Sequence, residues 1–126
     1  MKRKREFVDY LRDILDTIKK VEQFTEAMDF ERFSTDDKTV FAVVQALEVI
    51  GEAAKKIPKA IQRQNPEIPW REMAGIRDKL IHEYFGMNLL VVWKTVVEDL
   101  PRLKPVISLM LEKAVAGGKY STGNGV

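Results

Sequence analysis

Hydrophobic residues recur every three to four positions through most of the chain, which is the spacing of one face of an α-helix. The first such stretch has its apolar positions at Phe7, Tyr10, Leu11, Ile14, Leu15, Ile18, Val21 and Phe24. Residues 29–37 interrupt the period and supply carboxylate and hydroxyl side chains that suit a helix N-cap. We therefore expect one helix over 7–24 and a second helix that begins near Asp36.

The second amphipathic stretch contains a glycine, Gly51, before it ends near Ile57. Its apolar positions are Val40, Val43, Val44, Leu47, Ile50, Ala54 and Ile57. A glycine inside a helix costs about 1 kcal/mol relative to alanine. That cost is offset where another helix backbone approaches closely, so we expect a close helix crossing at Gly51.

Prolines punctuate the stretch that follows, at Pro58, Pro66 and Pro69. Each proline removes an amide donor and disfavours helical geometry in the residue before it. We therefore expect residues 57–69 to form a loop with at most a short helix. A third helix is predicted from about Trp70 to Phe85, ending near Gly86.

A fourth helix is predicted from Asn88 onward, with its apolar face at Leu89, Val92, Trp93, Val96, Val97 and Leu100. Pro101 is expected to break or kink it, because proline disrupts a helix interior. A last helix then continues through Ile107, Leu111 and Ala114. Residues 117–126 contain four glycines and almost nothing to bury, so we expect a flexible C-terminal tail.

These elements predict an all-α protein with an up-and-down bundle of four to five helices, because short connections make consecutive helices antiparallel neighbours. No strand alternation, internal repeat or phosphate-binding glycine loop is found in the sequence. Residues 1–116 are expected to form a single helical domain. Trp70 and Trp93 lie at helical spacing among apolar neighbours, which favours core packing over base stacking.

Composition narrows the class of protein further. The chain has 126 residues, 45% of them hydrophobic and 32% charged, which is typical of a soluble globular protein. Because cysteine is absent and His82 is the only histidine, disulfides, thiolate metal sites and histidine-rich metal sites are not expected. We expect no membrane and a cytoplasmic location, because no apolar run is long enough to span a bilayer and no signal peptide precedes the first helix. We also expect no metal and no cofactor.

Candidate chemistry is concentrated in the predicted third helix. At about 100° per residue, Asp78 and His82 lie roughly 40° apart, while Arg77 and Tyr84 are almost eclipsed. Arg77 and His82, however, lie about 140° apart on a regular helix. They meet only if the helix loosens before Gly86, or if a two-fold dimer brings an arginine and a histidine from different chains into one cleft. We favour the dimer.

Cleavage of RNA without a metal needs a base of near-neutral pKa to accept the 2′-hydroxyl proton, and a fixed cation beside the phosphorus oxygens. His82 and Arg77 are of the right types, and Asp78 could orient the imidazole or hold the guanidinium. On chemistry alone, a polar helix face with one solvated histidine is the more frequent explanation of such a pair.

A family resemblance changes this balance. Arg77, His82 and Tyr84 match the Arg-x4-His-x-Tyr signature of the HepT-like toxins, which belong to the HEPN (higher eukaryotes and prokaryotes nucleotide-binding) superfamily. Three further segments resemble that family in the same order, namely residues 46–58, 68–78 and 100–104. The resemblance covers roughly residues 7–111.

The resemblance implies an all-α, HEPN-like bundle that forms a homodimer across its motif helices, with a metal-independent endoribonuclease site in the cleft. By the same resemblance, Arg77 and His82 are the catalytic pair, Asp78 is their polar neighbour, and Tyr84 is a modification site. The implied partner is a minimal nucleotidyltransferase antitoxin, which transfers AMP from ATP to Tyr84 and silences the toxin. An anionic nucleotide on Tyr84 would repel an RNA backbone from the cleft.

Three alternatives stay open on the sequence. The basic run Lys2–Arg5 could bind RNA phosphates or simply be solvated. Glu48 and Glu52 could line the cleft or hold Arg77, and a solvated stripe is an equal alternative. The protein could also be a non-catalytic binding or regulatory subunit for a nucleotidyltransferase. We favour the enzyme, because a binding platform has no need of Arg77, His82 and Tyr84 together.

Overall fold

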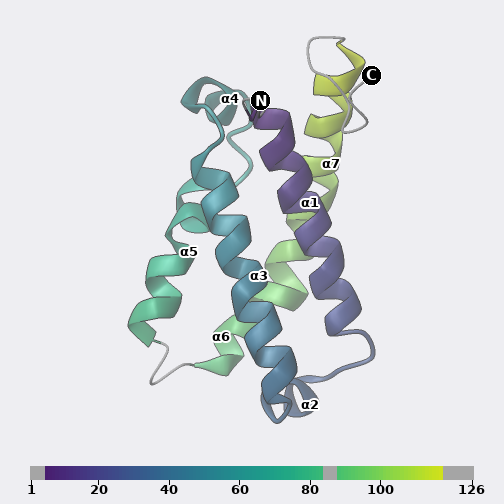
Figure 1. Ribbon diagram of the computed structural model, residues 1–126, viewed down its shortest axis with the longest axis vertical. Coiled ribbons are helices and arrows are strands. Elements are labelled where there is room, and N and C mark those ends of the chain that lie inside the picture. The colour runs from purple at the N-terminus through teal and green to yellow at the C-terminus, as the bar shows by residue number, and fades with distance from the viewer. Residues whose placement is uncertain (1–4, 84–87, 118–126) are drawn as a thin grey trace.

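The computed structural model describes residues 5–83 and 88–117, with the side chains of 77–83 outside that description. The described residues form helices joined by short turns, with no strand among them (Figure 1). The elements are α1 (Phe7–Phe24), α2 (Phe30–Ser34), α3 (Asp37–Lys55), α4 (Lys59–Gln64), α5 (Trp70–Glu83), α6 (Leu89–Lys94), the π-helical segment η2 (Thr95–Asp99) and α7 (Leu100–Ala116). The all-α prediction is confirmed.

The long helices run in alternating directions, as expected of an up-and-down bundle. In Figure 1, α1 descends, α3 ascends, α5 descends again, and the chain returns through α6 and α7. Helix α3 packs against α1 on one side and α5 on the other, and α7 packs against α1. The short helices α2 and α4 lie at opposite ends of the bundle.

The core forms where the predicted apolar faces meet. Its fully buried side chains include Leu11, Ile14 and Ile18 of α1, Val43, Leu47 and Ile50 of α3, and Ile107 of α7. Full burial of one such side chain stabilises the fold by roughly 1.5–3 kcal/mol. Both tryptophans pack as expected: Trp70 is buried, and the Trp93 ring lies 5.0 Å from that of buried Phe33.

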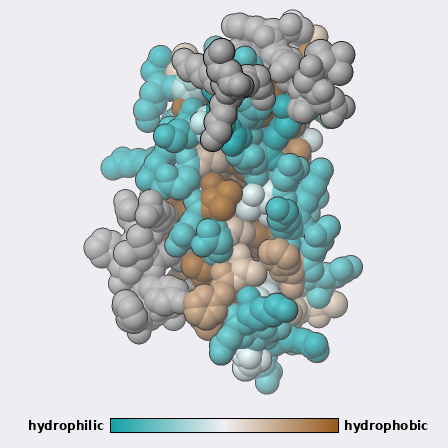
Figure 2. Space-filling model, viewed as in Figure 1, coloured by the Kyte–Doolittle hydropathy of each residue, from teal (hydrophilic) through white to brown (hydrophobic). Residues whose placement is uncertain are grey.

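One face of α3 remains open to solvent. In Figure 2 a band of hydrophobic side chains runs down this face over α3, between hydrophilic side chains on both sides. The exposed large hydrophobic residues of α3 are Phe41 and Val49. The central helix of the bundle is therefore covered on its α1 and α5 sides but not toward the viewer of this figure.

The expected start of the second long helix is confirmed. The Asp36 carboxylate accepts a hydrogen bond from the Thr39 backbone N–H at 3.1 Å, which caps α3. Just before it, however, the interruption that we expected over 29–37 contains the five-residue helix α2. Asp29 caps α2, and Phe33 anchors it with a side chain that is 0% exposed. Tertiary burial thus stabilises a helix too short to be visible in the periodicity.

The close helix crossing predicted at Gly51 is present between α3 and α5. A Cβ atom at Gly51 would lie 2.8 Å from Cγ2 of Ile76 and 2.9 Å from the carbonyl oxygen of Met73. Ordinary contacts between carbon atoms are about 3.5–4.0 Å. Glycine therefore lets the two helix backbones approach more closely than any larger residue would.

The break that we expected at Pro101 is absent, because Pro101 lies in the first turn of α7 and helical structure continues through it. The irregularity lies just before the proline instead, where η2 replaces α-helical turns with π-helical ones. Proline lacks an N–H, and its ring clashes with the carbonyl four residues earlier. The wider π-turns shift the hydrogen-bond register at that point, which lets the helix accept the proline.

The interval 57–69 contains one short helix, α4, in agreement with the prediction. At the other end, α7 finishes at Ala116, and the Gly117 N–H donates to the Lys113 carbonyl at 3.1 Å. Residues 118–126 of the predicted tail lie outside the described residues. Within the described part, no helix is both long enough and apolar enough to cross a membrane.

Candidate functional site

Helix α5 carries three of the four predicted site residues, Arg77, Asp78 and His82. Their side chains lie outside the description, and Tyr84 lies outside the described residues altogether. The backbone remains α-helical from Trp70 to Glu83. Positions 77 and 82 therefore keep their separation of about 140° around the helix axis. The loosening that would bring this pair together within one chain does not occur between the two positions.

The first half of α5 is held firmly against the bundle. Trp70 and Met73 are buried, and the Trp70 Nε1–H donates to the Asn65 carbonyl at 3.0 Å. Ile76 packs against Gly51 at the crossing with α3. Since Arg77 follows Ile76 directly, the tight crossing fixes the point at which the motif begins. From there α5 runs on toward the end of the bundle occupied by α6 (Figure 1).

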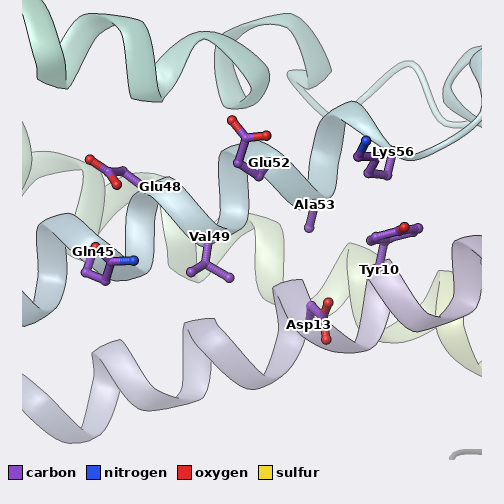
Figure 3. A pocket seen from close by; sticks show the side chains of 8 residues that line it. All are labelled: Tyr10, Asp13, Gln45, Glu48, Val49, Glu52, Ala53 and Lys56. Atoms are coloured by element: carbon purple, nitrogen blue, oxygen red, sulfur yellow. The ribbon is translucent and has the colours of Figure 1, made fainter. Parts of the chain in front are cut away.

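Glu48 and Glu52 of α3 lie beside this part of α5. Both are partly buried, and both line a groove of about 280 Å³ between α1 and α3. Figure 3 shows the two carboxylates on the side of α3 away from α1, where the ribbon of α5 runs. Gly51, which touches α5, lies between them in sequence. The two carboxylates are therefore not a fully solvated stripe, and a role for them at a cleft stays a prediction.

The opposite wall of the same groove shows what one residue of the basic N-terminal run does. Arg5 donates to the Asp13 carboxylate at 2.7 Å, and its guanidinium carbon lies 4.7 Å from the centre of the Tyr10 ring. Both Asp13 and Tyr10 line the groove (Figure 3). Arg5 is therefore bound to α1, the helix that begins two residues after it. Lys2, Arg3 and Lys4 lie outside the described residues, so an RNA-binding role for them stays a prediction.

The pKa shift found among the described groups belongs to a carboxylate that stabilises a helix. The pKa of Asp36 is lowered because its carboxylate accepts hydrogen bonds from the backbone and side chain of Thr39. This is the carboxylate that caps α3. The described side chains contain no group of three His, Cys, Asp or Glu residues placed to hold a metal ion.

Comparison with known proteins connects the chain to a family of ribonucleases. A family model described as "Ribonuclease HepT-like" matches residues 14–110. A protein of Thermococcus cleftensis named "Probable ribonuclease HepT" is 58% identical over 101 residues, which are 80% of this chain and 92% of that protein.

More distant relatives carry similar names. Two proteins of Methanocaldococcus jannaschii, each named a putative RNase, are 48% identical over 101 residues, or 80% of this chain and 87% and 84% of theirs. A protein of Caldanaerobacter subterraneus, also named a putative RNase, is 39% identical over 104 residues, or 82% of this chain and 93% of its own length. No solved structure matches the chain. The matched range 14–110 includes the whole motif and both groove carboxylates, Glu48 and Glu52.

Proposed function

The chain belongs to the HepT-like ribonuclease family, and on that basis we propose that it is a metal-independent endoribonuclease. We propose further that it is the toxin of a toxin–antitoxin pair whose antitoxin is a minimal nucleotidyltransferase. One observation carries the proposal: the Arg-x4-His-x-Tyr pattern lies inside the range matched by the family model. That pattern begins directly after Ile76, which packs at the crossing of α5 with α3.

The proposed chemistry uses two residues of α5. His82, as a neutral imidazole, accepts the proton of a ribose 2′-hydroxyl, whose oxygen then attacks the adjacent phosphorus. The bond from phosphorus to the 5′-oxygen of the next nucleotide breaks, and that oxygen takes a proton from an imidazolium. The products are a 2′,3′-cyclic phosphate and a 5′-hydroxyl. Arg77 stabilises the charge that grows on the non-bridging oxygens, and Asp78 orients the imidazole or the guanidinium.

Two copies of the chain are needed to complete this site. Because α5 stays regular, positions 77 and 82 of one copy point in different directions around the helix axis. A two-fold axis beside α5 would place Arg77 of one copy and His82 of the other in a single cleft. We therefore propose a homodimer with a composite active site.

Regulation is proposed to act on Tyr84. The nucleotidyltransferase would direct the tyrosine oxygen onto the α-phosphorus of ATP, so that an O–P bond forms and pyrophosphate leaves. The AMP group would add negative charge to the motif, seven residues after Arg77 in the sequence. It would then compete with the RNA backbone for the same cation.

The test is to incubate the purified protein with transfer RNA and other cellular RNA in excess chelator, next to His82→Ala. Mass spectrometry first confirms that Tyr84 is unmodified. We expect the wild type alone to produce new ends that carry 2′,3′-cyclic phosphates, while His82→Ala keeps the same circular dichroism spectrum and oligomeric state. Equal cleavage by both proteins would overturn the role of His82. Cleavage by neither would favour a non-catalytic regulatory subunit for the nucleotidyltransferase.

A further inference from the structure

A cluster of unbalanced positive charge lies where α3, α4 and α5 meet. Residues 55–71 include five basic side chains and one acidic one, a net charge of +4, whereas the whole chain carries +2. The rest of the chain therefore sums to −2. The five cations are Lys55, Lys56, Lys59, Arg63 and Arg71, which we call the basic end, and all five are exposed.

The local fold forces these cations outward. Ile57, Ile68 and Trp70 are buried between them, and the five cations lie on the exposed side of the segment. Side chains also tie the segment to its own backbone: Gln62 Nε2 donates to the Ile57 carbonyl at 2.9 Å, and Asn65 Nδ2 donates to the Ile61 carbonyl at 3.0 Å. The basic end is thus presented on a well-anchored turn of chain beside the start of α5 (Figure 1).

Most of this charge has no ion-pair partner among the described residues. Lys55 lies 3.4 Å from a Glu52 carboxylate oxygen, in a pair that is largely exposed. For the other four cations, the described part of the chain offers no carboxylate within ion-pair distance. Clustered cations without counter-charges raise the local positive potential, which attracts polyanions.

Helix α5 connects the basic end to the motif along one face. Arg71 and position 82 are eleven residues apart, which is about three turns, roughly 20° around the axis and about 16 Å along it. Gly75 falls in the same stripe, and a Cβ atom there would meet no described atom within 4 Å. The helix surface between Arg71 and the motif therefore has no side chain at Gly75. A nucleic-acid strand could lie close to the helix backbone at this position.

We propose that the basic end binds the phosphates of the RNA strand that leaves the catalytic cleft, so that the substrate runs along the Arg71–Gly75 face of α5. This inference rests on the proposed ribonuclease function. These contacts are made to phosphates and not to bases. They therefore increase affinity for RNA of any sequence and position the RNA strand for cleavage. Each phosphate contact on a single strand contributes about 0.7 to the slope of log affinity against log salt concentration.

The experiment measures binding of a fluorescein-labelled single-stranded RNA over a series of salt concentrations. All proteins carry His82→Ala, which prevents cleavage during the measurement. The test variant adds Lys59→Glu and Arg63→Glu on α4. The matched control adds Lys19→Glu and Lys20→Glu, which are exposed on α1, the helix that α3 separates from α5. Both double variants change the net charge equally, and thermal unfolding checks that each is folded.

We expect the α4 variant to lose at least tenfold in affinity at low salt, with a salt slope smaller by about 1.4 for two lost contacts. The α1 control should keep the slope of its parent. Equal slopes in all three proteins, or equal losses in both double variants, would overturn the inference. If the α4 variant is unfolded, the milder pair Lys59→Gln and Arg63→Gln is compared with Lys19→Gln and Lys20→Gln in the same way.

The two proposals fail in different ways. If the protein with intact His82 cleaves RNA in chelator but the α4 variant binds like the control, the basic end is wrong and the ribonuclease proposal stands. If that protein neither binds nor cleaves RNA, both proposals are wrong. An acidic protein partner at the basic end would give the first of these results.

Discussion

Replacing Gly51 by alanine tests the crossing of α3 and α5, on which the position of the motif depends. The new methyl carbon would lie 2.8 Å from Ile76 Cγ2 and 2.9 Å from the Met73 carbonyl oxygen. Separation to ordinary contact requires a shift of about 0.7 Å or more. The Ile76 methyl could turn away, but the Met73 oxygen belongs to the backbone of α5 and moves only with the helix.

The expected change in stability is a balance of two terms. Overpacking a close contact costs about 1–3 kcal/mol, while alanine is favoured over glycine in a helix by about 1 kcal/mol. The net expectation for Gly51→Ala is therefore a loss of about 1 kcal/mol in the free energy of unfolding. Urea unfolding followed by helical circular dichroism, at one fixed protein concentration, measures this difference.

Gly75→Ala is the matched control within α5. No described atom lies within 4 Å of a Cβ at that position, so only the helix-propensity term applies. We expect the free energy of unfolding of Gly75→Ala to rise by about 1 kcal/mol. The changes in the two variants then have opposite signs, and their stabilities differ by roughly 2 kcal/mol. If Gly51→Ala is stabilised as much as Gly75→Ala, the tight crossing does not exist in solution. A displaced α5 should also slow RNA cleavage in Gly51→Ala.

Two further predictions concern single side chains. Arg77→Lys should lower the rate of RNA cleavage by about a hundredfold, with the fold intact, because lysine keeps the charge but loses the planar fork that can hold two phosphate oxygens; a rate equal to that of the wild type would exclude such a role. Asp36→Ala should lower the thermal midpoint by removing the cap of α3. Because the pKa of Asp36 in the folded protein is below its ordinary value of 3.8, the stabilisation is complete well above pH 3.8 and is lost as the pH falls through the lowered pKa. The midpoints of wild type and Asp36→Ala should therefore converge in acid, and a constant difference at every pH would contradict this account.

Local sequence information was sufficient for the long helices. The bounds of α1 and the start of α3 directly after its cap, Asp36, follow from periodicity and capping, which depend on residues a few positions apart. It was insufficient for α2 and for Pro101. Helix α2 exists because Phe33 is buried by distant elements, and Pro101 is accepted because η2 changes the register before it.

In the candidate site, too, some residues could be selected from the sequence, whereas the surroundings of others depend on the tertiary structure. Arg77, Asp78 and His82 could be selected from their spacing and from the family resemblance, and the structure places all three on one regular helix. Glu48 and Glu52 lie more than twenty residues before Arg77 in sequence. The sequence left open whether they form a solvated stripe; the packing of α3 between α1 and α5 makes both partly buried, on the side of α3 where α5 runs.

The two helical glycines show most directly where each kind of information ends. The sequence alone determined an all-α chain, the faces of its long helices, and an energetic cost of about 1 kcal/mol at Gly51. Only the tertiary structure decided that Gly51 is packed against α5 while Gly75 faces open space. The physical reason is that periodicity specifies a direction around a helix's own axis, whereas the neighbour in that direction is set by how distant segments pack.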